Sequence, residues 1–199
     1  MTTQNPSMLD RRLAIVRILR DRGDALAISS LGNPTFDLAA AGDSAQNFYL
    51  WGAMGGAVMT GLGLAQAQPG KRVIVFAGDG EMMMGLGSLA TVAAHGAPNL
   101  SIVVIDNEHY AETGMQPAHA GRGVDIAAVA TACGFATATV VRTEAELDQA
   151  VDAILHGVGP VLANVKVATD LQPASLPPRD GPYLRSRFRE ALLGTEAHR

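Results

Sequence analysis

The chain has 199 residues, of which 48% are hydrophobic and 17% charged, and its formal net charge is −4. This balance excludes an intrinsically disordered acidic chain, and at roughly 150 residues per domain the length favours one domain with a single core. The 15 lysines and arginines do not outnumber the 19 acidic residues. A nucleic-acid-binding protein is therefore not expected.

No apolar stretch reaches the roughly 18 residues that cross a bilayer. The N-terminal segment 1–7 has neither the basic start nor the apolar run of a secretory signal. The single cysteine, Cys133, lies in a segment typical of a buried helix and cannot form an internal disulfide. These features predict a cytoplasmic protein that does not bind membranes.

Helical and strand patterns alternate along the chain. In chain order the expected elements are a helix over 9–21, a strand over 25–30, a helix over 35–41, a strand over 47–50, a helix over 57–68, a strand over 71–77, a helix over 82–95, a strand over 100–105, a helix over 126–131, a strand over 135–141, a helix over 144–156 and a strand over 160–167. Three helices have an expected N-cap, namely Thr35, Asp125 and Thr143, the last in a capping box with Glu146.

The alternation predicts an α/β fold with an open, mainly parallel sheet and helices on both faces. Residues 1–168 form the expected domain, and 169–199 form a proline-containing C-terminal tail with a short helix over 183–193. The segment between Asp106 and Val124 is polar, contains several glycines and has no clear period. A loop of that length in a compact domain is a candidate active-site loop.

Polar residues follow the two strongest strands at the edge where ligands bind in such sheets. Gly78-Asp79-Gly80 ends the first, and Asp106-Asn107 ends the second. The glycines permit a sharp turn into a helix whose N–H groups, from about Glu81 onward, can bind a diphosphate. A divalent cation such as Mg²⁺ would bridge that anion to Asp79 and Asn107, with a backbone carbonyl just after Asn107 as a third ligand.

Two other interpretations of these residues stay open. An isolated Asp-Gly dipeptide is more often a plain turn. The segment also has the outline of a dinucleotide-binding unit, which would make the chain a non-catalytic regulatory protein. However, Met83 stands where that fingerprint needs a small residue, and the alternative register over 85–90 starts inside the expected helix.

The order of Gly78-Asp79-Gly80, a helix, a strand and Asp106-Asn107 resembles the cofactor motif of thiamine-diphosphate-dependent enzymes, which begins GDG and ends in NN or DN. The resemblance spans residues 10–168 and is to the diphosphate-binding (PP) domain of that family. It implies that Asp79, Asn107 and the main-chain oxygen of His109 bind Mg²⁺. Gly52-Ala53-Met54 is similar to the family loop in which Met54 would separate the two rings of the cofactor and the Gly52 carbonyl would accept from the aminopyrimidine.

The resemblance implies a cofactor-binding set drawn from three segments, 52–54, 78–81 and 107–110. Its members are Gly52, Ala53, Met54, Gly78, Asp79, Gly80, Glu81, Asn107, His109 and Tyr110. For catalysis it implies Met54 as the residue that bends the cofactor, with His109, Glu112 or His119 as proton-transfer groups and His109 preferred. Arg122 is a candidate partner for an acidic group of the substrate.

The family also needs a glutamate from a pyrimidine-binding domain, and the first eighty residues of this chain contain none. The resemblance therefore implies an α-type partner subunit and a hetero-oligomer. Leu31-Gly-Asn-Pro34 and the segment 106–116 resemble the sulfopyruvate and phosphonopyruvate type of decarboxylase. The implied reaction is decarboxylation of a small 2-oxo acid to an aldehyde, with a lyase or synthase, or a 2-oxo acid oxidoreductase subunit, as the alternatives.

Overall fold

The computed structural model describes residues 8–198. Segment 1–7, on which the expectation of no secretory signal rests, lies outside the described residues. Within residues 8–198 no helix is long and apolar enough to cross a membrane. Cys133, expected in a buried helix, is half-buried at the end of its helix.

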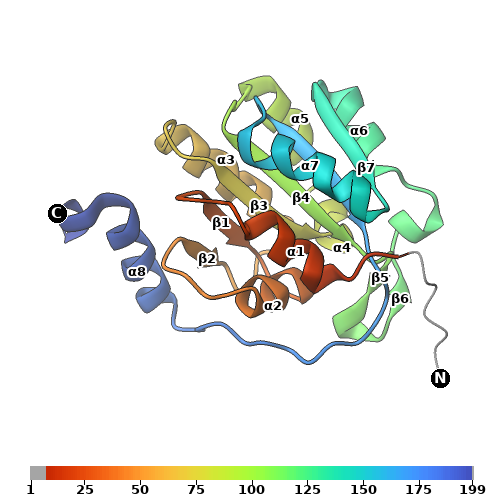
Figure 1. Cartoon of the computed structure of the whole chain (residues 1–199), viewed down its shortest axis with the longest axis horizontal. Coiled ribbons are helices and arrows are strands. Elements are labelled where there is room, and N and C mark those ends of the chain that lie inside the picture. The colour runs from red at the N-terminus through yellow and green to blue at the C-terminus, as the bar shows by residue number, and fades with distance from the viewer. Residues whose placement is uncertain (1–7, 199) are drawn as a thin grey trace.

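Six parallel strands form one sheet in the order β2-β1-β3-β4-β8-β7 (Figure 1). Their bounds are β1 Leu26–Ser29, β2 Asn47–Tyr49, β3 Val73–Gly78, β4 Leu100–Asp106, β7 Thr137–Val141 and β8 Val161–Lys166. The open parallel α/β sheet expected from the sequence is confirmed.

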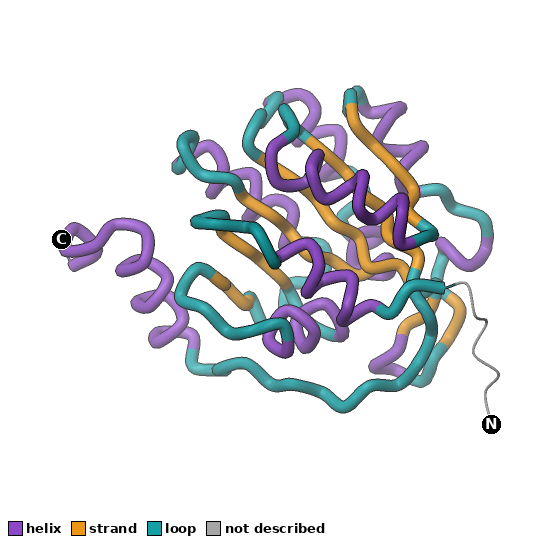
Figure 2. Tube along the Cα trace, viewed as in Figure 1, coloured by secondary structure: helices purple, strands orange, loops and turns teal. Residues whose placement is uncertain are grey.

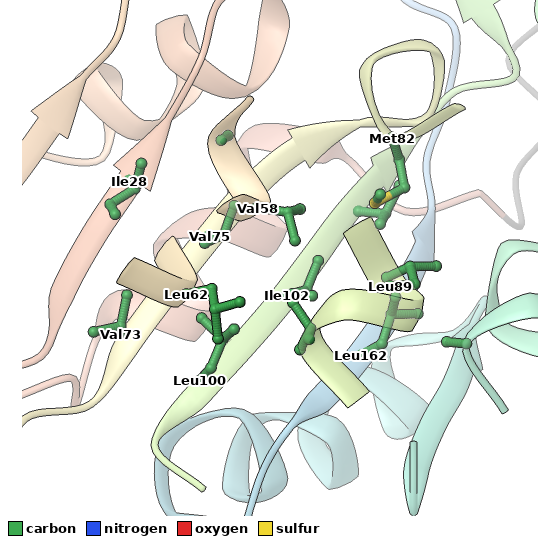
Figure 3. Packing of buried hydrophobic residues seen from close by; sticks show 14 of the residues in the cluster. Ile28, Val58, Leu62, Val73, Val75, Met82, Leu89, Leu100, Ile102 and Leu162 are labelled. Carbon is green, nitrogen blue, oxygen red and sulfur yellow. The ribbon is translucent and has the colours of Figure 1, made fainter. Parts of the chain in front are cut away.

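Helices cover both faces of this sheet (Figure 2). Their bounds are α1 Arg11–Leu19, α2 Asn33–Ala40, α3 Ala57–Ala67, α4 Asp79–Met84, α5 Ser88–His95, α6 Ile126–Cys133, α7 Glu144–His156 and α8 Gly181–Leu193. Alternate residues of β3 separate the two cores: Val73 and Val75 pack with α3, α5 and α6 (Figure 3), whereas Ile74 and Phe76 pack with α1, α2 and α7. Burial on both faces explains the continuous aliphatic runs of the central strands.

The helix expected over 82–95 is instead two helices, because α4 begins at Asp79 and the chain breaks at Gly85 before α5. At the break the backbone of Gly85 packs against Gly55, and a Cβ at Gly85 would lie 2.3 Å from the Gly55 carbonyl oxygen. This close approach of two backbones interrupts the helix, whereas the residue pattern alone predicts one continuous helix.

Two of the three expected caps are confirmed. The Asp125 side chain accepts from the N–H of Ala128, and Thr143 forms the capping box with Glu146. The expectation for Thr35 is wrong: α2 begins two residues earlier, and the Thr35 hydroxyl donates to the Ser29 hydroxyl at 2.9 Å. The earlier start uses Gly32, with φ of 73°, and places a proline in the first turn.

The chain beyond β8 runs over the surface and leads into α8, which is followed by a 3₁₀ helix over Gly194–His198 (Figure 1). Along this path the carbonyl of Pro178 accepts from the Trp51 indole at 2.6 Å. Helix α8 then packs on β2, where the rings of Phe188 and Phe48 are 5.3 Å apart and Arg187 pairs with Asp43 at 2.6 Å. Helix α8 is therefore packed against β2, an edge strand of the sheet.

Two glycines of α3 provide a matched test of the helix–sheet packing. A Cβ at Gly61 would lie 2.3 Å from Val75 Cγ2, whereas a Cβ at Gly63 meets nothing within 4 Å. We expect Gly61→Ala to lower the free energy of unfolding by about 1–3 kcal/mol through overpacking, and Gly63→Ala to raise it by about 0.5–1 kcal/mol through helix propensity. Urea unfolding of both variants measures this, and equal effects would contradict the packing described.

Candidate active site

A cavity of about 270 Å³ lies at the carboxyl ends of β3 and β4. In the register, Gly78 pairs with Ile105, so the residues that follow both strands emerge at the same edge. Nine of the sequence-predicted residues line this cavity: Met54, Gly78, Asp79, Gly80, Glu81, Asn107, His109, Tyr110 and Glu112. The structure thus brings together the residues expected from the two strand ends.

Asp79 is the first residue of α4 and is 2% exposed. Its Oδ2 atom has no hydrogen-bond partner among the described residues. Burial, together with the nearby charge of Asp106, raises the pKa of the Asp79 carboxyl to about 7, against the opposing effect of the backbone N–H groups at the start of α4. A buried carboxylate of this kind is stabilised by a cation.

Asp106, by contrast, has a full set of partners. Its Oδ2 accepts from Lys166 Nζ at 2.7 Å and from the Asn164 amide at 3.0 Å, and its Oδ1 accepts from the N–H of Glu108 at 3.0 Å. Burial lowers the pKa of Lys166, but the hydrogen bonds and charges of Asp106 and Glu108 outweigh it and raise that pKa overall. Of these two buried carboxylates, Asp79 is the one left for a further ligand.

The turn after β4 presents the other predicted oxygens. Asn107 is 8% exposed, and its Oδ1 accepts from the N–H of His109 at 3.1 Å. His109 begins β5, His109–Tyr110, which pairs with β6, Gln116–Pro117. Because Ala118 N–H donates to the Glu108 carbonyl and Pro117 has no N–H, the His109 carbonyl lies outside the hydrogen bonds of this ribbon. That oxygen is available to a ligand, as the prediction for a third metal ligand requires.

The segment 106–124 is therefore more ordered than its lack of period indicated. Besides β5 and β6 it contains 3₁₀ helices over Ala111–Thr113 and Ala120–Arg122. Tyr110 packs on the first turn of α4, where a Cβ at Gly80 would lie 2.3 Å from its ring. Only glycine at position 80 permits this contact, which joins the loop to α4.

The glycine loop before α3 forms another wall of the cavity through Met54, which is 39% exposed. The residues on either side of Gly52 have left-handed backbones, with φ of 54° at Trp51 and 55° at Ala53. Such strain costs about 1–3 kcal/mol per residue and is concentrated at functional sites. Gly52 and Ala53 themselves do not line the cavity, and the Gly52 carbonyl accepts from the Ser30 hydroxyl at 2.8 Å.

Glu81 is 4% exposed, and neither of its carboxylate oxygens has a hydrogen-bond partner among the described residues. Burial raises its pKa to about 7, although Ser30 and the backbone N–H groups of Gly55 and Ala57 oppose the shift. Its side chain therefore lies beside the glycine loop, a placement that the sequence did not indicate.

Sequence reasoning missed the wall formed by α1 and the start of α2. Gly32, Asn33 and Arg11 line the cavity. Arg11 is 1% exposed and pairs with Asp37 at 2.7 Å. The Gly-Asn-Pro sequence at a helix start was an available signal, whereas an arginine of an amphipathic helix is ordinarily exposed and gave none.

Two further sequence candidates, besides Gly52 and Ala53, do not line the cavity. His119 and Arg122 are both exposed, and the Tyr110 hydroxyl lies 3.3 Å from His119 Nδ1. For the dinucleotide interpretation, the glycines of the alternative register, 85–87, lie between α4 and α5 rather than at a strand end, whereas Gly78 and Gly80 of the first register do lie where β3 leads into α4.

The donor set fits a hard divalent cation bound together with an anion. Within residues 8–198 no three His, Cys, Asp or Glu side chains are grouped to hold a metal by themselves. The predicted set instead offers one carboxylate, one amide and one backbone carbonyl, all oxygens, and the unpartnered Oδ2 of Asp79 is an open ligand position. Mg²⁺ ordinarily combines few protein oxygens with the phosphates of its partner.

The fold is an open α/β sheet with a cavity at the carboxyl edge, the place where such sheets bind ligands. A family model described as thiamine pyrophosphate enzyme, C-terminal TPP binding domain, matches residues 31–165. The chain belongs to this family of thiamine pyrophosphate (thiamine diphosphate) enzymes, which confirms the resemblance inferred from Gly78-Asp79-Gly80 and Asp106-Asn107.

Individual relatives agree with this assignment. The chain is 43% identical over 160 residues to the sulfopyruvate decarboxylase subunit beta of Methanothermobacter thermautotrophicus, covering 80% of this chain and 83% of that subunit. It is 38% identical over 158 residues to the phosphonopyruvate decarboxylase of Streptomyces viridochromogenes, covering 79% of this chain but 39% of that protein. The benzoylformate decarboxylase of Polynucleobacter necessarius shares the fold, with a TM-score of 0.71 at 18% identity over 87% of this chain and 36% of that chain.

The two buried aspartates at this edge give a matched test of the charge assignment. Without metal at pH 8, Asp79→Asn removes an unpartnered buried charge and should raise the free energy of unfolding by about 1–3 kcal/mol. Asp106→Asn removes the charged partner of the buried Lys166 and should lower the free energy of unfolding by about 3 kcal/mol.

The folded pKa of Asp79 lies above its usual value of 3.8. Ionisation of this carboxyl therefore destabilises the folded protein, and the free energy of unfolding of the wild-type protein falls as the pH rises from about 4 to about 7. The gain from Asp79→Asn should therefore be smaller at pH 5 than at pH 8. Urea unfolding at both pH values measures this, and destabilisation by Asp79→Asn at pH 8 would show that its carboxylate is satisfied within the chain.

Proposed function

We propose that this chain is the diphosphate-binding subunit of a Mg²⁺- and thiamine-diphosphate-dependent decarboxylase. The substrate is a small 2-oxo acid of the sulfopyruvate or phosphonopyruvate kind, and the product is an aldehyde. The observation that carries the proposal is the buried, unpartnered carboxylate of Asp79 in the same cavity as Asn107 and His109.

The proposed metal ligands are the Asp79 carboxylate, the Asn107 side-chain oxygen and the main-chain oxygen of His109. The proposed diphosphate site is the start of α4, where Gly78-Asp79-Gly80 leads β3 into the helix and backbone N–H groups attract an anion. The start of α2, at Asn33, lines the same cavity and supports a second contact to that anion.

Bound thiamine diphosphate supplies the electron sink for the loss of carbon dioxide. The part of this chain is to position and enclose the reactants. Met54, held on a strained loop, is placed to set the shape of the cofactor, and the ordered segment after Asn107 shields the cavity from water. His109 and Glu112 line the cavity and are the proposed proton-transfer groups, with His109 Nδ1 held 2.9 Å from the Asn107 carbonyl oxygen.

A partner subunit is part of the proposal. Glu81 and Glu112 are the glutamates lining the cavity, and both belong to walls of this domain itself: Glu81 lies in α4 beside the glycine loop, and Glu112 lies in the loop after Asn107. The glutamate that activates the aminopyrimidine would therefore come from an α-type, pyrimidine-binding chain in a hetero-oligomer. The names of the relatives support this, since several are beta subunits and the phosphonopyruvate decarboxylase is more than twice as long as the matched segment.

The test is a calorimetric titration of thiamine diphosphate into the chain, with and without Mg²⁺ and with and without the co-expressed partner. We expect binding that requires Mg²⁺ and is at least about tenfold tighter with the partner, because half of the site lies on the other chain. Asn107→Ala should lose the Mg²⁺-dependent binding of the cofactor. Tight binding of NAD by the chain alone, independent of Mg²⁺, would contradict the proposal and favour a dinucleotide-binding protein.

A further inference from the structure

The buried lysine Lys166 has no role in the function proposed so far. It is the last residue of β8, is 6% exposed, and pairs with Asp106 Oδ2 at 2.7 Å and with Glu108 Oε1 at 2.8 Å. Removing an ammonium group from water costs several kcal/mol, so a buried ion pair is weak evidence for stability alone. The placement of Lys166 therefore needs another explanation.

Its two partners lie on either side of Asn107 in the sequence, and Asn107 is a proposed metal ligand. Asp106 pairs with Lys166 in the register of β4 and β8, so the ammonium group lies directly beside the end of β4. Asp106 also contacts the turn after β4 directly, because its other carboxylate oxygen accepts from the N–H of Glu108. Lys166 thus holds the turn through one side chain before Asn107 and one after it.

The turn that Lys166 holds is strained. Glu108 has φ of 63°, a left-handed conformation that costs a residue with a Cβ about 1 kcal/mol or more. In this conformation the Asn107 side chain accepts from His109 N–H, and the His109 carbonyl stays outside the β5–β6 ribbon. The positions of both proposed ligand oxygens therefore depend on the strained backbone at Glu108. Without the contacts that hold it, this backbone would relax to a lower-energy conformation.

We propose that Lys166 is a positioning residue for the metal-binding turn. By pairing with Asp106 and Glu108 it holds Asn107 and the His109 carbonyl in place before the cofactor arrives. This inference rests on the proposed function for the identity of the metal, but the ordering of the turn is a property of the chain itself.

The chain offers a matched control, because it contains two lysines and the other, Lys71, pairs with Asp24 at 2.5 Å at the opposite end of β3. The variants are Lys166→Met, Lys71→Met and Glu108→Ala. Glu108→Ala keeps the Cβ and hence the backbone strain, and removes one contact of Lys166 at a partly exposed side chain, so it tests the inference even if Lys166→Met fails to fold.

Two measurements decide the matter, one on the chain alone and one on the chain with its co-expressed partner subunit. Hydrogen exchange of the chain without ligands reports the amides of Glu108 and His109, which we expect to exchange at least about tenfold faster in Lys166→Met and faster to a smaller degree in Glu108→Ala. Mn²⁺ electron paramagnetic resonance of the chain with its partner and thiamine diphosphate reports metal binding, which should weaken by about tenfold or more in Lys166→Met. Lys71→Met should match the wild-type protein in both measurements.

The outcomes separate this inference from the proposed function. Unchanged exchange at Glu108 and His109 in both Lys166→Met and Glu108→Ala would overturn the positioning role. Equal Mn²⁺ affinity in wild-type protein and Lys166→Met would also overturn it. If the wild-type chain with its partner subunit binds no Mn²⁺ with thiamine diphosphate, the proposed function fails, and the exchange measurement still decides whether Lys166 orders the turn.

Discussion

The structure depends on how two acidic strand ends share one edge of a buried parallel sheet. The register of β3 and β4 brings Asp79 and Asp106 to this edge, where burial and the charge of Asp106 raise the pKa of Asp79. Lys166 neutralises Asp106 from the neighbouring strand. Asp79 keeps an unpartnered oxygen in a cavity, so the fold leaves this carboxylate to be balanced by a cation from outside the chain, whereas the unpartnered carboxylate of Glu81 lies beside the glycine loop.

The short helix α4 connects this charge with the rest of the cavity. Asp79 is its first residue, and the ring of Tyr110 packs on Gly80. At the end of α4, the backbone of Gly85 packs against the backbone of Gly55 in the glycine loop. The proposed metal end of the cavity and the loop bearing Met54 are thus fixed to one six-residue element. A displacement of α4 would move both together, which gives a physical reason for the glycines at 55, 80 and 85.

Much of this arrangement could be predicted from the sequence, because parallel strands are aliphatic on both faces and their carboxyl ends meet at one edge. That logic placed Asp79 and Asn107 in one site. It could not find the break at Gly85 or the placement of Lys166, since both depend on contacts between segments far apart in the chain. It also gave Thr35 a capping role that Gly32 takes over, because a hydroxyl contact to Ser29 competes with the cap.

We propose that Asp79, Asn107 and the His109 carbonyl together hold the ion that binds the cofactor diphosphate. The most direct measurement is a crystal structure of the chain with its partner subunit, Mg²⁺ and thiamine diphosphate. The account predicts one ion at about 2.0–2.1 Å from an oxygen of each of the three residues. A cofactor bound with its diphosphate elsewhere, or with the Asp79 carboxylate turned away from the ion, would contradict it.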